Sequence, residues 1–127
     1  MTSKRFFAVT AGLEVGAGLA LVVAPALVIR LVLGLSEIQT GVAIGRLAGT
    51  ALISLGAACW WARFDAGSAA SRGLVSSLLI YNGTVVALVL SGSFGPLGPL
   101  LWAVVLAHGA MAIWCVWLLQ VIRLRRP

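Results

Sequence analysis

The sequence predicts an all-α integral membrane protein, a bundle of four membrane-spanning helices. Of its 127 residues, 61% are hydrophobic and only 9% are charged, whereas soluble domains are about half apolar and a quarter charged. The apolar residues gather in four runs, each close to the roughly 20 residues that cross a hydrocarbon core. Most basic residues lie at the ends of these runs, where membrane topology signals are found. The length indicates one domain, residues 1–127.

The first span, residues 6–24, carries a carboxylate, Glu14, about half-way along its length. A charge at that depth costs several kcal/mol unless it is paired or neutral. Pro25 then interrupts the pattern, because proline is tolerated at the first position of a helix but poorly inside one. Residues 25–33 therefore form either a separate short helix at the membrane interface, with Arg30 at the surface, or the tilted end of one long kinked helix.

Glycines at four-residue intervals mark the expected helix contacts. In the second span, residues 41–61, such glycines share one helix face, and the first span has the same spacing. Small residues at this interval let two backbones approach closely in lipid. The helix-packing glycines predicted on this basis are Gly41, Gly45 and Gly49 in the second span and Gly12 and Gly16 in the first.

The third and fourth spans, residues 73–90 and 99–122, are separated by a turn rich in glycine and proline. Because four spans return the chain to the side from which it started, both termini lie on one side of the membrane. We predict that this side is cytoplasmic, since it then holds most of the basic residues. These residues are Lys4, Arg5, Arg63, Arg72, Arg123, Arg125 and Arg126.

Each span contributes a strongly polar residue near the middle of the membrane. At about 1.5 Å per residue from the cytoplasmic face, Glu14 and Tyr81 lie roughly 12 Å deep, with Asn82 just beyond them. In a core about 30 Å thick, His108 lies near 16 Å and Arg46 near 22 Å. These five residues are the candidate intramembrane site. Glu14 and Arg46 are predicted as a coupled pair, although their backbones differ by about 10 Å in height, a gap that a helix tilt, a water molecule or His108 could close. The site is either a hydrogen-bond network that fixes helix register or a proton or substrate site.

Other kinds of function have little support in the sequence. No nucleophile, base and orienting group stand in a catalytic pattern and no phosphate loop is present, so we expect neither an enzyme nor catalytic residues. One histidine, and two cysteines outside any CxxC pattern, indicate no metal and no cofactor. The net charge of +6 reflects topology signals rather than nucleic-acid binding. Cys59 and Cys115 lie near the reducing cytoplasmic side and are predicted to be free thiols.

Two resemblances to known families add to this interpretation. Leu13-Glu14-Val15-Gly16 resembles the membrane-embedded glutamate motif in the first span of the small multidrug resistance transporters. This resemblance implies that Glu14 is a proton and cation site. It covers that span alone, because the aromatic, proline and glycine pattern of the family's later spans is absent.

Most of the chain resembles an uncharacterised group of small four-span bacterial inner-membrane proteins. This second resemblance implies the fold and an inner-membrane location, and no activity. The residues that carry it are Glu14, Gly18-Leu19, Pro25, Arg46, Gly49, Ala51-Leu52, Leu55-Gly56, Ala58-Cys59-Trp60, Tyr81-Asn82, Leu100-Leu101-Trp102 and His108.

Two functions fit these observations. The first is a non-enzymatic accessory or interaction subunit of a larger membrane complex, as the short chain, tiny loops and glycine faces suggest. Its partners would be the lipid bilayer and other membrane subunits or a second copy. The alternative is a small proton-coupled transporter or channel that acts as an oligomer through the mid-membrane Glu/His/Arg site. The two are distinguished by whether Glu14 and His108 line a hydrated cavity or are sealed by apolar side chains.

Overall fold

The structure is a computed structural model that describes residues 2–35, 39–92 and 98–124. Within these ranges the chain forms helices only: α1 (Thr2–Val23), α2 (Pro25–Leu33), α3 (Gln39–Ala62), α4 (Ala69–Leu90) and α5 (Leu101–Leu124). Four of these helices, all but α2, are long and apolar enough to cross a membrane. The predicted all-α architecture with four spans is therefore confirmed.

Helix α4 begins four residues before the predicted third span, and the cause is local. The Ser68 side chain accepts a hydrogen bond of 3.0 Å from the Ser71 backbone N–H. Such an N-cap satisfies one of the amide groups that a helix start leaves unpaired. Residues 69–72 therefore form the first turn of the helix.

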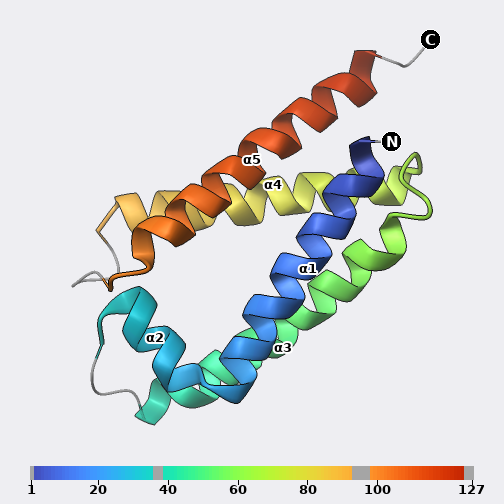
Figure 1. Cartoon of the computed structure of the whole chain (residues 1–127). Coiled ribbons are helices and arrows are strands. Elements are labelled where there is room, and N and C mark those ends of the chain that lie inside the picture. The colour runs from blue at the N-terminus through green and yellow to red at the C-terminus, as the bar shows by residue number, and fades with distance from the viewer. Residues whose placement is uncertain (1, 36–38, 93–97, 125–127) are drawn as a thin grey trace.

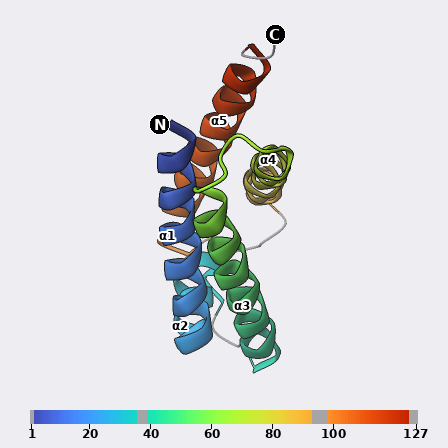
Figure 2. The ribbon, with the colours of Figure 1, turned by 90° about the vertical axis from the view of Figure 1, so that its right-hand side faces the viewer.

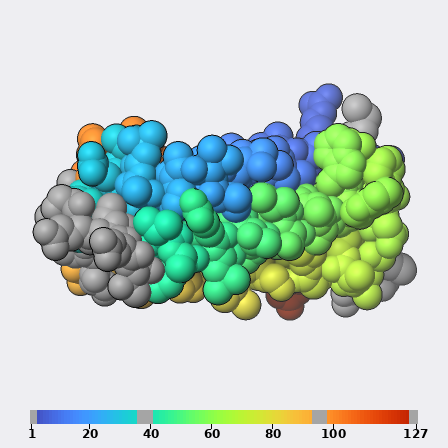
Figure 3. Space-filling view, turned by 90° about the horizontal axis from the view of Figure 1, so that it is seen from below, coloured from blue at the N-terminus to red at the C-terminus, as the bar shows by residue number. Residues whose placement is uncertain are grey.

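Helices α1 and α3 form an antiparallel pair in close contact along their length (Figures 1 and 3). The contact depends on glycine. A Cβ atom added to Gly18 would lie 2.6 Å from the Gly49 carbonyl oxygen, and one added to Gly49 would lie 2.6 Å from the Gly18 oxygen. Farther along, a Cβ atom on Gly56 would meet Val15 at 2.7 Å. The two backbones thus approach as closely as small residues permit in lipid.

Of the glycines predicted to pack, two lie against neighbouring helices: Gly45 and Gly49 are buried, with atoms of α1 or α2 close to an added Cβ. Gly41 is half-buried. Gly12 and Gly16 are exposed, with nothing within 4 Å of an added Cβ. The face of α1 that meets α3 instead follows the spacing of Ala11, Val15, Gly18 and Val22. Since each residue turns a helix by about 100°, Gly12 and Gly16 are rotated off that face.

Helix α2 is a separate short helix, which decides between the two alternatives for residues 25–33. Ala24 leaves the helical conformation at φ −132° and ψ 55°, and Pro25 is the first helical residue. At the other end Gly34 has φ 70° and donates its N–H to the Arg30 carbonyl at 2.9 Å. Glycine adopts this left-handed conformation without a Cβ penalty.

Backbone hydrogen bonds join the end of α2 to the start of α5. The Gly98 N–H donates to the Val32 carbonyl at 3.1 Å, and the Leu100 N–H donates to the Leu31 carbonyl at 3.0 Å. A Cβ atom on Gly98 would collide with the Leu31 carbonyl group. These bonds hold α2 between the two long helix pairs at the end far from the N-terminus (Figure 1).

The second pair is α4 with α5, and it meets the first pair at one end of the molecule. There Phe6 of α1 packs edge-on against Trp114 of α5, with ring centroids 5.3 Å apart. We call this region the closed end. Its fully buried side chains include both cysteines, which are free thiols as predicted. The apolar cluster comprises Phe6, Phe7, Ala11, Cys59, Val75, Leu78, Met111, Cys115 and Leu118.

From the closed end the two pairs diverge (Figures 1 and 2). The described ends of α1 and α5 that carry Lys4, Arg5 and Arg123 lie at the closed end. This agrees with the prediction that both termini share one side of the membrane. Arg125 and Arg126, which entered the same prediction, lie outside the described residues.

Candidate functional site

Beyond the closed end, the diverging pairs leave a cavity of about 540 Å³. All five helices contribute to its wall, α3 through Leu52 alone. The lining side chains are apolar except for four, Glu14, Tyr81, Asn82 and His108. The volume falls within the roughly 300–1,000 Å³ of small-molecule sites, which combine apolar walls with a few polar groups.

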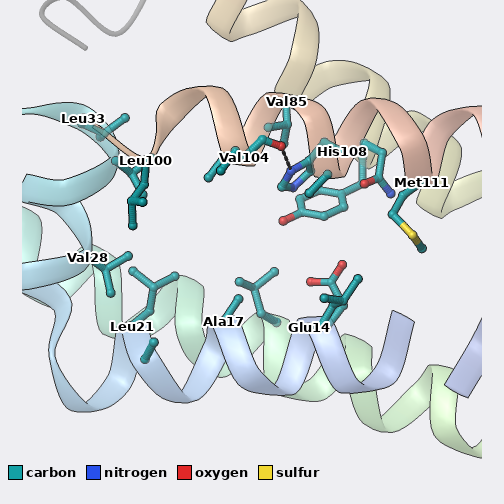
Figure 4. A pocket seen from close by; sticks show the side chains of 18 of the residues that line it. Glu14, Ala17, Leu21, Val28, Leu33, Val85, Leu100, Val104, His108 and Met111 are labelled. Atoms are coloured by element: carbon teal, nitrogen blue, oxygen red, sulfur yellow. Dashed lines mark hydrogen bonds between the residues drawn. The ribbon is translucent and has the colours of Figure 1, made fainter. Parts of the chain in front are cut away.

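Glu14 projects from α1 into this cavity. Its side chain is only 9% exposed, and Figure 4 shows the carboxylate pointing toward the wall that carries His108. Within the described residues no hydrogen bond or ion pair reaches it. Thr10, one turn earlier on α1, bonds instead to the Phe6 carbonyl at 2.9 Å. Buried polar groups are nearly always hydrogen-bonded, so this carboxylate is an exception among buried polar side chains.

His108 faces Glu14 from α5. Its Nδ1 lies 2.8 Å from the Val104 carbonyl oxygen (Figure 4). Because a carbonyl oxygen only accepts, Nδ1 must carry the hydrogen and donate it. In the neutral ring this leaves Nε2 as an acceptor. The ring also packs edge-on against Tyr81 of α4, with centroids 5.6 Å apart, which fixes its orientation.

The other two polar side chains come from α4. The Asn82 side chain is 3% exposed, and its Nδ2 donates to the Leu78 carbonyl at 2.7 Å. This leaves the amide oxygen and one N–H without a partner in the described chain. The Tyr81 hydroxyl likewise makes no hydrogen bond there. Four polar groups therefore line one cavity, yet none of them bonds to another.

The cavity has a polar end and an apolar end. Glu14 and His108 lie toward the closed end, whereas Leu21, Val28 and Leu33 lie toward α2 (Figure 4). The lining residues of α1 run from Leu13 to Leu21. At 1.5 Å per residue the cavity is roughly 12 Å long on that wall. It matches a molecule with an apolar body and a single polar head.

Arg46, the fifth predicted site residue, lies apart from the others. Its side chain is exposed on α3, is absent from the cavity wall and makes no ion pair within the described chain. The physical reason is its place on the helix: Gly45 faces α1 and α2, and Arg46 is turned about 100° away from it. The structure thus does not pair Glu14 with Arg46.

Several features of the site were missed by sequence reasoning. One is the role of α2, whose Val28, Ile29, Val32 and Leu33 supply the apolar end of the cavity. Another is the Gly18–Gly49 contact that holds α1 against α3. The sequence does contain a pattern that indicates this contact. Its residues have the spacing of one helix face, and they are Ala11, Val15, Gly18 and Val22.

The fold and cavity define the class of protein: a small multi-pass protein with four helices able to span a membrane. Comparisons with protein-family models, with curated proteins and with solved structures find no significant match. In the part of the chain that the structure describes, no three His, Cys, Asp or Glu side chains are grouped so as to hold a metal ion.

Proposed function

We propose that this protein binds a small, mainly apolar molecule within the membrane, between its two helix pairs, and exchanges it for a proton on Glu14. Of the two functions considered from the sequence, this is the small proton-coupled transporter. The observation that carries the proposal is the unpartnered Glu14 carboxylate in the cavity wall. Intramembrane ionisable residues that face a cavity mark substrate or proton pathways.

The alternative role for these polar groups, a structural network, is poorly supported by their geometry. Such a network needs bonds between helices, and each member must be satisfied. Asn82 and His108 instead bond to carbonyls of their own helices. Glu14 and the Tyr81 hydroxyl bond to nothing in the described chain. The four polar side chains make no hydrogen bonds to one another, so their remaining bonding capacity is available to a ligand.

The proposed chemistry is a competition for one carboxyl group. In an apolar site the carboxylate is stable when a ligand supplies a compensating group, and the empty site is stable when the carboxyl holds a proton. Ligand binding and proton release are then coupled by the same free energy. One chain supplies the complete cavity, so binding requires no oligomer, although passage across the membrane can still use one.

Proteoliposomes loaded with a pH-sensitive dye test this proposal. A panel of small apolar compounds is added, and proton movement is compared with that in protein-free liposomes. We expect proton movement with the wild type, and loss of it in Glu14→Gln and in Ala17→Phe, which fills the cavity. Ala87→Phe, on an exposed part of α4 outside the cavity, is the matched control and should behave as the wild type. Equal proton movement in all variants would contradict the proposal.

A second candidate function is the accessory subunit, and one surface favours it. Most exposed residues of α3 between positions 43 and 58 are small or hydroxylated, including Ala43, Thr50, Ala51, Ser54 and Ala57. Small residues are typical of helix–helix contacts in membranes. On this proposal the face docks another subunit in a bacterial inner membrane.

Purification from native membranes in a mild detergent tests the second candidate. A partner in fixed ratio should co-purify with the wild type and with Ile113→Leu on the exposed face of α5. It should be lost from Ala57→Leu, which enlarges the α3 face. Recovery of the chain without any such partner would exclude the accessory role.

A further inference from the structure

We infer that the corner between α3 and α4 binds the headgroup of an anionic phospholipid, with the guanidinium group of Arg63 on the lipid phosphate. This site shares no residue with the cavity, so the inference is independent of the proposed function. Three observations carry it: an arginine side chain without a hydrogen-bond partner, exposed aromatic rings beside it, and an excess of positive charge at the same end of the molecule.

The corner lies where a membrane-spanning helix ends. Helix α3, which is long and apolar enough to cross a membrane, ends at Ala62, and α4 begins at Ala69. Ala62 and Ala66 pack against the apolar cluster of the closed end, and Figure 1 shows the turn between the two helices there. A helix of this length ends near the boundary between hydrocarbon and headgroups. The turn therefore lies at the depth of the lipid headgroups.

The Arg63 side chain is held by aromatic rings but has no acceptor for its N–H groups. Its Cζ lies 3.2 Å from the centroid of the Trp60 ring and 4.4 Å from that of the Phe64 ring. Rings attract a cation through their faces, and this contact leaves the N–H groups at the edge of the guanidinium plane unused. Within the described chain the side chain forms no ion pair and no hydrogen bond. Nε is buried, whereas the two Nη nitrogens are not, so they can reach an external acceptor.

A phosphate group is an acceptor that suits this geometry. The planar guanidinium forms paired hydrogen bonds with the oxygens of a phosphate or carboxylate. Asp65 is the one exposed acidic residue in the described chain, and it forms no ion pair with Arg63 there. Clusters of basic residues beside a membrane span attract anionic headgroups. The described basic residues at this end are Lys4, Arg5, Arg63, Arg72 and Arg123.

The aromatic surface favours a lipid over a soluble anion. The side chains of Trp61 and Phe64 are 71% and 63% exposed, with ring centroids 6.1 Å apart. A free phosphate would contact Arg63 and leave these rings without an apolar neighbour. A phospholipid places its glycerol and first acyl carbons beside them, at the level of the membrane where tryptophan is enriched. An anionic phospholipid thus matches both the charge and the rings, and the bilayer presents it at the required depth.

Two lipids with the same acyl chains separate headgroup charge from apolar contact. Wild-type protein in a nonionic detergent is titrated with dioleoyl phosphatidylglycerol or with dioleoyl phosphatidylcholine, and bound lipid is measured by native mass spectrometry. We expect phosphatidylglycerol to bind roughly tenfold or more tightly, because its headgroup is anionic. Equal affinity would overturn the inference. This comparison uses the wild type, so it does not depend on how any variant folds.

Substitutions of arginine then locate the site. Arg63→Gln should reduce the preference for phosphatidylglycerol to about threefold or less, because it removes the charge. Arg63→Lys keeps the charge but not the planar fork, so its preference should lie between those of Arg63→Gln and the wild type. Arg30→Gln, which removes the same charge from an exposed position on α2 at the other end of the molecule, is the matched control and should keep the wild-type preference. An undiminished preference in either folded Arg63 variant would overturn the placement of the phosphate on this guanidinium.

Two water-soluble competitors test other anions of suitable charge. Glycerophosphoglycerol has the same headgroup without acyl chains, and a tetraglutamate peptide represents an acidic protein segment. Neither should displace phosphatidylglycerol when present at the same concentration. Displacement by glycerophosphoglycerol would indicate a site for free phosphate esters, and displacement by the peptide would indicate a site for protein. Either result would overturn the assignment of a lipid.

Discussion

The closed end and the cavity end of this molecule are built from the same four long helices, yet only one of them is packed. At the closed end α1 presents Phe6 and Phe7, both fully buried. At the cavity end α1 presents Ala17 and Ala20, and α5 opposes them with Ala103 and Ala107. Large side chains fill the space between the helix pairs at the closed end. At the cavity end these alanines leave room beside larger lining residues such as Leu21 and Leu100.

Polar groups differ between the two ends in the same way. Thr10 at the closed end is 1% exposed and bonds to a carbonyl of its own helix. Glu14, one turn farther along α1, is also buried but has no partner within the described chain. The comparison shows that the chain can satisfy a buried polar side chain where the structure is closed. At Glu14, which lines the cavity, the described chain supplies no such partner.

The largest expected effect is a difference in unfolding free energy between substitutions at the packed closed end and at the cavity end. Leu118→Ala at the closed end, where the side chain is 1% exposed, should lower the free energy of unfolding by about 3 kcal/mol. Leu100→Ala on the cavity wall, where the side chain is 47% exposed, should cost about 0.5 kcal/mol. Equilibrium unfolding of both variants in the same detergent measures the difference. Equal losses would show that the cavity end is packed as well.

A smaller effect tests the contact that forms one wall of the cavity. Gly18→Ala places a Cβ atom against the Gly49 carbonyl, and the resulting separation of α1 from α3 should cost about 2 kcal/mol of unfolding free energy. Gly16→Ala makes the same chemical change where nothing lies within 4 Å. It should be neutral or stabilise by up to about 1 kcal/mol, because alanine favours the helix. Thermal unfolding ranks the two, and the reverse order would refute the α1–α3 contact face.

The sequence was sufficient for the fold because each span carries its own signal. The apolar runs, the break at Pro25 and the basic ends predict elements that the structure contains. Glu14, Tyr81, Asn82 and His108, to which the helical rise gives similar predicted depths, line one cavity in the structure.

What the sequence could not supply is the rotation of each helix about its own axis. Depth does not depend on that rotation, but contacts do. Gly12 and Gly16 have the same spacing as Gly45 and Gly49, yet they face away from α3. Arg46 has a suitable depth, yet it faces away from Glu14. The cavity itself depends on how the two pairs diverge, and no local pattern in the sequence encodes that.

The smallest expected effect concerns Glu14 and Arg46. Because they lie in different surroundings and form no ion pair within the described chain, their substitutions should act independently. In a double-mutant cycle of Glu14→Gln and Arg46→Gln, the two changes in unfolding free energy should add to within about 0.5 kcal/mol. A coupling clearly above that value would restore the pairing that the sequence suggested.

The central claim, that one end is closed and the other is an accessible cavity, is tested most directly by thiol labelling. The wild type supplies two buried cysteines at the closed end, Cys59 and Cys115, and Ala17→Cys adds one on the cavity wall. Purified protein is treated with a small water-soluble methanethiosulfonate and weighed intact by mass spectrometry. The account predicts one adduct on the Ala17→Cys protein and none on the wild type. An unlabelled Ala17→Cys protein, or a wild type labelled as readily, would contradict it.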